Sequence, residues 1–173
     1  MKKILLVTSL LVVSGVAFSA VGAEADLKVR AEVISPLSIT TSPVDFGVLT
    51  KGEKNIVSFG RSGAKNGIID IKGEAARNVK LTLGDTVSNS YVILSNGIVG
   101  STSTLTAGLR VDDKRGGLIE IGNYFATPFT LDVNGSKKLD VVGTIDEVPL
   151  NADTGIYIST VKLTAAYDFN PGK

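Results

Sequence analysis

Carboxylate groups are the side chains of this sequence best suited to chemistry, because the chain has neither histidine nor cysteine. Without imidazole there is no Ser-His-Asp arrangement and no histidine metal ligand. Without thiols there is no cysteine nucleophile, no thiolate metal cluster and no thiol redox chemistry. Two kinds of site remain conceivable: a pair of carboxylates, as in glycosidases, or a serine activated by lysine.

The acidic candidates are two pairs of neighbours, Asp112-Asp113 and Asp146-Glu147. Adjacent residues on a strand point to opposite faces of a sheet, so neither pair converges on one substrate atom. We therefore interpret both pairs as solvated loop charges. The expectation is a protein that is not an enzyme and that uses no cofactor and no metal.

Other polar signals have simpler explanations than a binding site. Asp132-Val133-Asn134-Gly135 resembles part of a calcium loop, but it lacks the later acidic ligands that would complete the coordination. A tight turn accounts for it. Lys114-Arg115 and Lys137-Lys138 are interpreted as solvated turn charges.

Aromatic residues make up 6% of the chain, and tryptophan is absent. That content disfavours stacking on sugars as a main mode of binding. Tyr91, Tyr124 and Phe125 are the candidates for such contacts, and core packing is the simpler explanation of each of them.

The elements that would position any site are short strands. Apolar residues recur with period two, the pattern of strands that bury one face, and Val, Ile and Thr dominate the runs. The pattern predicts strands over 27–33, 56–59, 68–71, 79–83, 91–94, 109–111, 118–121, 129–133, 139–145 and 156–169.

Turn signals separate these runs and set the fold class. Asn66-Gly67, Asn96-Gly97 and Asn134-Gly135 each suit a tight hairpin, and no helical pattern is found beyond the N-terminal segment. We predict a single all-β domain over 24–173, a β-sandwich in preference to a barrel.

The first residues have the pattern of an export signal. Lys2 and Lys3 precede an apolar run over 4–13, and Val21-Gly22-Ala23 fits a cleavage site of small side chains. We predict a signal peptide over 1–23, with cleavage after Ala25 as the alternative. The mature chain is expected to be exported, in the periplasm in transit and then at the cell surface or extracellular.

The charge balance restricts the partners. The 18 basic and 17 acidic residues nearly cancel, whereas nucleic-acid binding calls for a dense basic face. No later segment is long and apolar enough to cross a bilayer. We expect no nucleic acid and no membrane insertion after signal cleavage.

Three stretches together resemble a known family. They are 31–40 with the following Val44-Asp45-Phe46-Gly47, then 139–145, and finally 155–167. They resemble a family of exported bacterial β-sandwich proteins described only as a domain of unknown function, which is similar in turn to the subunits of chaperone–usher fimbriae. The resemblance covers essentially the whole mature chain.

The resemblance implies a mechanism. Fimbrial subunits look like immunoglobulin folds that lack one strand, and the N-terminal extension of each subunit fills the groove of the next. A periplasmic chaperone holds the groove open until an outer-membrane usher exchanges it for the extension. Their final strand carries a glycine twelve residues before an aromatic residue, and Gly155 precedes Tyr167 by the same spacing.

The residues that would carry this mechanism fall into two sets. The first set is a donor strand within an extension over 24–35, and it comprises Leu27, Val29, Ala31 and Val33. The second set is a groove along the final strand, and it comprises Gly155, Val161, Leu163, Ala165 and Tyr167. The sequence thus predicts a structural subunit of a bacterial surface fibre (a fimbria or pilus) that contacts like subunits by donor-strand exchange. The alternative is a monomeric periplasmic or surface-exposed binding module whose N-terminal strand folds back into its own sandwich.

Overall fold

The computed structural model describes residues 25–84, 87–88, 90–112 and 117–169, and it divides into two units that meet between Val33 and Ile34. In the first unit, residues 25–33 form neither strand nor helix. Leu27, Val29 and Val33 are there 89%, 87% and 96% exposed. The predicted strand over 27–33 is absent from the single chain, because a strand needs the backbone of a partner for its N–H and C=O groups. The predicted signal peptide over 1–23 lies outside the described residues.

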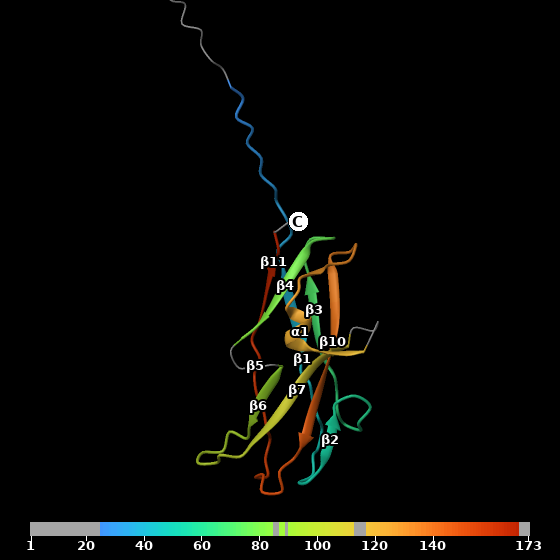
Figure 1. Cartoon of the computed structure of the whole chain (residues 1–173), viewed down its shortest axis with the longest axis vertical. Coiled ribbons are helices and arrows are strands. Elements are labelled where there is room, and N and C mark those ends of the chain that lie inside the picture. Colours follow the sequence, from blue (N-terminus) through green and yellow to red (C-terminus); the bar gives the residue numbers. More distant parts are fainter. Residues whose placement is uncertain (1–24, 85–86, 89, 113–116, 170–173) are drawn as a thin grey trace, which may run out of the picture. The chain divides into compact units, whose positions relative to one another are not determined.

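The second unit, from Ile34 onward, contains all the described strands (Figure 1). The elements are β1 (Ser38–Ser42), β2 (Lys54–Val57), β3 (Gly67–Lys72), β4 (Asn78–Leu83), β5 (Val87–Ser88), β6 (Tyr91–Ser95), β7 (Thr104–Asp112), β8 (Leu118–Glu120), α1 (Ile121–Phe125), β9 (Phe129–Thr130), β10 (Ser136–Glu147) and β11 (Leu163–Tyr167).

The strands form two antiparallel sheets. In the larger sheet the order is β1-β3-β10-β7-β6-β5, with β2 beside β10 and β8 beside β7. The smaller sheet has the order β11-β4-β9. The predicted all-β class is confirmed.

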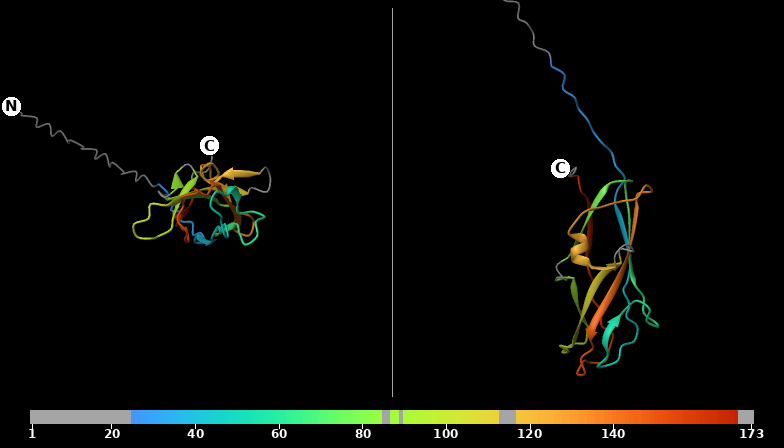
Figure 2. Two further views of the ribbon diagram at one scale, coloured as in Figure 1. Left: turned by 90° about the horizontal axis from the view of Figure 1, so that it is seen from below. Right: turned by 45° about the vertical axis from the view of Figure 1, so that its right-hand side comes forward.

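Buried apolar residues from both sheets make one core. Buried side chains alternate along the strands, as Ile69 and Ile71 do on β3 and Val79 and Leu81 do on β4. They pack together with residues of β7, β10 and α1. The end-on view in Figure 2 shows the strands arranged around this common interior.

The predicted final strand over 156–169 is too long. Only Leu163–Tyr167 forms a strand, and it pairs with β4 of the smaller sheet. Earlier in the segment Ile158 makes an isolated bridge to Ser95, at the end of β6 in the larger sheet. The segment changes partner between the two sheets, and this interrupts the ladder between Ile158 and Leu163.

The chain turns at two of the three predicted sites, but neither turn is a tight hairpin, because residues 96–103 separate β6 from β7 and β9 does not pair with β10. Asn96-Gly97 begins the connection between the paired strands β6 and β7, and Gly135 lies in a turn before β10; both glycines have positive φ. The prediction for Asn66-Gly67 is wrong, because Gly67 is the first residue of β3 and the chain turns earlier, at Gly63.

A short helix was not predicted. Residues 118–121 were expected to continue as strand, but β8 ends at Glu120 and α1 begins at Ile121. Ile121 and Phe125 are four residues apart, on one face of the helical turn, and both are buried. The Ser90 hydroxyl accepts a hydrogen bond from the Gly122 N–H at 2.9 Å and helps to hold the turn.

Candidate functional site

Two edge strands lie beside a cavity over the core. Among the described strands, β1 pairs only with β3, and β11 pairs only with β4. Each therefore offers one edge to further backbone pairing. The two strands belong to different sheets, and both contribute to the same cavity.

That cavity has a volume of about 350 Å³. The end of β1 and the residues after it line one side, and Ser159 to Val161 with Leu163 line the other. A second cavity of about 600 Å³ adjoins it and shares Val44, Phe46 and Leu94 with it. We call the two cavities together the edge groove.

The floor of the edge groove is the hydrophobic core itself. Val92, Ala107 and Leu109, each at most 8% exposed, line the first cavity, and Leu105 and Ile145 line the second. An open groove over core residues leaves apolar surface without a covering layer. Such a groove fits an extended segment with alternating apolar side chains.

The first wall of the edge groove is fixed on the larger sheet. Val44 and Phe46, after β1, approach β10 at Gly143, where a Cβ atom would collide with both side chains. The Asp45 backbone exchanges two hydrogen bonds with Lys65, of 2.8 and 2.7 Å. The small residue in the middle of β10 thus allows the wall to lie against the sheet.

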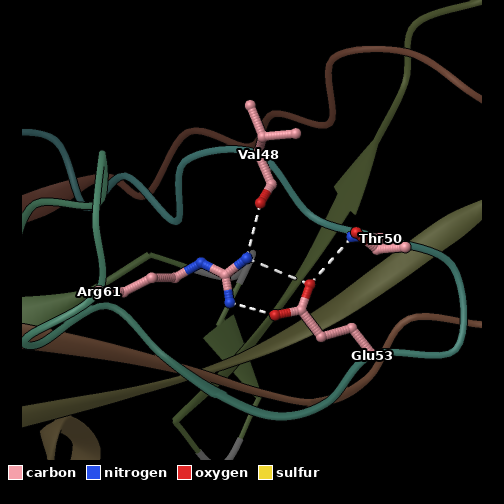
Figure 3. Close-up of polar contacts among 4 residues, drawn as sticks. All are labelled: Val48, Thr50, Glu53 and Arg61. Atoms are coloured by element: carbon pink, nitrogen blue, oxygen red, sulfur yellow. Dashed lines mark hydrogen bonds and ion pairs between the residues drawn. The ribbon is translucent and has the colours of Figure 1, made fainter.

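A salt bridge holds the lower part of this wall (Figure 3). The Arg61 guanidinium binds both carboxylate oxygens of Glu53 and donates a 2.6 Å hydrogen bond to the Val48 carbonyl. The Thr50 N–H donates to the same carboxylate at 2.9 Å. The hydrogen bond from Arg61, followed by that from Thr50, lowers the pKa of Glu53 below its ordinary value. Val48, Leu49 and Lys51 line the second cavity, so the ion pair supports the groove.

A network of hydroxyl groups holds the opposite wall. The Tyr157 hydroxyl donates to the Asp153 carbonyl at 2.9 Å and lies 2.5 Å from the Ser103 hydroxyl. Ser103 in turn accepts the Asp153 N–H at 3.0 Å, and the Ser101 hydroxyl donates to the Asp153 carboxylate at 2.7 Å. These contacts attach residues 153–157 to the connection between β6 and β7.

The predicted groove residues lie in two places. Gly155 lines the second cavity, and Val161 and Leu163 line the first. Ala165 and Tyr167 line neither cavity and pack half-buried against the core farther along β11. Leu27, Val29, Ala31 and Val33 belong to the first unit, and all four are exposed.

The first wall and the floor of the edge groove were not identified as site residues from the sequence. The sequence shows the alternation of apolar and polar residues in Val44-Asp45-Phe46. Whether this segment lines a groove depends, however, on which strands lie at the edges of the sheets. Strand order is a non-local property that a period of two does not encode.

The weaker candidates do not assemble into a site. Asp146 and Glu147 are exposed at the end of β10, and Glu147 pairs with Lys54 at 3.3 Å. Asp112 is the last residue of β7, while Asp113 to Gly116, and with them Lys114-Arg115, lie outside the described residues. Lys137 and Lys138 lie on β10 and not in a turn. Within the described ranges, no three acidic residues lie close enough together to hold a metal ion.

The remaining two groups have structural roles. The Asp132 carboxylate accepts the N–H groups of Asn134 and Ser136, both at 2.8 Å, as the turn interpretation predicts. Tyr124 stacks edge-on against Phe125 with ring centroids 5.8 Å apart, and Phe125 is buried. Tyr91, on β6, is 44% exposed.

The sequence matches no protein-family model and no curated protein. In the part of the chain that the structure describes, no helix has the length and apolar character needed to span a membrane.

Proposed function

We propose that this chain is a structural subunit of a bacterial surface fibre, exported through the periplasm and polymerised by donor-strand exchange. The extension over 24–35 of one copy occupies the edge groove of the next. The domain is then an immunoglobulin-like sandwich lacking one strand, and a periplasmic chaperone and an outer-membrane usher handle the open groove before assembly.

The observation that carries the proposal is the edge groove. Its floor is core, and its first cavity is bordered by the end of β1 on one side and the start of β11 on the other. An added strand would find backbone partners at both borders and apolar contacts beneath it.

The extension has the matching chemistry. Leu27, Val29 and Val33 alternate with charged residues and are exposed in the single chain. Burying one leucine or valine side chain contributes about 1.5–3 kcal/mol. Three such side chains together contribute roughly 4.5–9 kcal/mol to strand addition, while the charged residues between them stay in solvent.

A competition experiment tests the proposal. The chain is unfolded and then refolded with an excess of a synthetic peptide of residues 24–34. We expect the peptide to bind the edge groove, to raise the melting temperature and to suppress multimers. A peptide with Val29→Asp is the matched control, because it would place a carboxylate on the apolar floor. A chain that refolds as a monomer and ignores both peptides would favour the self-inserted binding module.

A further inference from the structure

Tyr167 joins the two edge strands, β1 and β11, at the ends that do not line the edge groove. Its hydroxyl donates to the Ser35 carbonyl at 2.7 Å and accepts the Glu74 N–H at 2.6 Å. Ser35 precedes β1, and Tyr167 is the last residue of β11. The bond therefore connects the beginning of one edge strand to the end of the other.

Glu74 completes the cluster. Its carboxylate accepts the Ser35 N–H at 3.0 Å and the Ser35 hydroxyl at 2.7 Å. The hydrogen bond from the Ser35 hydroxyl, followed by that from the Ser35 N–H, lowers the pKa of Glu74 below its ordinary value. The backbone N–H, the carbonyl and the side chain of Ser35 all have partners as a result. We call Ser35, Glu74 and Tyr167 the Ser35 clasp.

The neighbouring residues are shaped to this cluster. A Cβ atom on Gly73 would collide with the Tyr167 hydroxyl and with Leu37, so glycine leaves room for the contact. Pro36 follows Ser35 directly. A residue before proline is restricted to extended backbone, which favours a straight path through Ser35.

Self-insertion would require the opposite path. For residues before Ile34 to lie along β1 of their own chain, the backbone must reverse between Val33 and Ser38. A tight hairpin centred on Ser35-Pro36 needs a positive φ at Ser35, and often at Pro36, whose ring fixes φ near −65°. A turn placed one residue later, over Pro36-Leu37, would require the Ser35 carbonyl to accept the Ser38 N–H in place of the Tyr167 hydroxyl. Either reversal also breaks the bonds of the Ser35 clasp.

We propose that the Ser35 clasp, together with Pro36, keeps the extension out of its own edge groove and so reserves it for the groove of a second copy. This inference rests on the proposed strand exchange. It assigns Ser35, Glu74 and Tyr167 as positioning residues that select between insertion in cis and insertion in trans.

Tyr167→Phe in the full mature chain tests this assignment. The substitution keeps the ring and removes both hydroxyl bonds. The readout is tryptic cleavage after Lys28 and Arg30, followed by mass spectrometry on the monomer fraction isolated by gel filtration. Wild-type monomer should be cut quickly, because its extension is not inserted. In the variant we expect cleavage about tenfold slower, since losing two hydrogen bonds shifts an equilibrium by roughly this factor.

The controls separate the clasp from a general loss of stability. Tyr91→Phe makes the same change on β6 and should leave cleavage at the wild-type rate. Pro36→Gly releases the backbone without touching the clasp bonds and should also slow cleavage. A variant that is only destabilised would be cut faster, so the sign of the effect is decisive.

Two outcomes would overturn the inference: wild-type monomer already protected at Lys28 and Arg30, or Tyr167→Phe monomer cut at the wild-type rate. The proportion of multimers in the wild type reports separately on the proposed function. Suppose that the wild type forms no multimers and its extension is cut freely, while the Tyr167→Phe variant is protected. That result would reject the proposed fibre but would support the role of the Ser35 clasp.

Discussion

Polar residues in this domain hold loops in place. The Glu53–Arg61 ion pair is the clearest case, because both side chains are about three-quarters removed from solvent, with 26% and 27% exposed. It fixes a wall of the edge groove through two further bonds to backbone groups of Val48 and Thr50. By contrast, the Lys54–Glu147 pair is 64% and 47% exposed and is expected to contribute little.

The ion pair predicts a pH dependence of stability. The pKa of Glu53 is lowered in the folded chain, so its contribution is present above the unfolded value of 4.5 and is lost as pH falls through the lower folded value. Wild type should therefore melt at a higher temperature than Glu53→Gln near neutral pH, and the gap should close in acid. Thermal unfolding followed by circular dichroism measures this gap. Glu147→Gln is the control, for which we expect almost no gap at any pH. A gap for Glu53→Gln that persists at the most acid pH would contradict the role of the carboxylate.

At the scale of elements, local patterns predicted strands well and their ends poorly. The alternation over 68–71 and 79–83 became β3 and β4, because each run buries one face of a sheet. The run over 156–169 showed the same alternation, yet only Leu163–Tyr167 found a continuous partner. Strand length depends on the neighbour as well as on the sequence of the strand.

The helix α1 is a second element that local sequence patterns did not predict. Its five residues are too few for a helical stripe to be read in the sequence, and its buried pair, Ile121 and Phe125, gains its place only from the surrounding core. Tertiary packing decided the conformation of this segment.

The register of β11 can be tested directly. Leu163 packs half-buried against the core, while Lys162 just before it is exposed. Leu163→Ala should reduce the free energy of unfolding by about 2 kcal/mol, at the low end for such a truncation because the side chain is only half-buried. Lys162→Ala should change it by less than about 0.5 kcal/mol. Denaturant unfolding of both variants provides the comparison, and equal losses would show that the register is wrong.

At the scale of the whole molecule, the sequence pointed to only a few of the residues that line the edge groove. Gly155, Val161 and Leu163 were expected along a groove and line the two cavities. Val44 and Phe46 on the facing wall became apparent only once β1 was seen at the edge of its sheet. A groove forms between two strands at the edges of their sheets, and which strands lie at an edge depends on the strand order.

The central claim is that one copy completes another through its extension. The most direct measurement is electrophoresis of the refolded chain in detergent without boiling, alongside gel filtration. The account predicts a ladder of multimers for wild type. Val29→Asp should abolish the ladder and leave a folded monomer, because an ionised carboxylate would have to be buried on the groove floor. Lys28→Asp places the same group at the neighbouring, solvent-facing position and should keep the ladder. A wild type that runs only as a monomer, or a Val29→Asp variant with an unchanged ladder, would contradict the account.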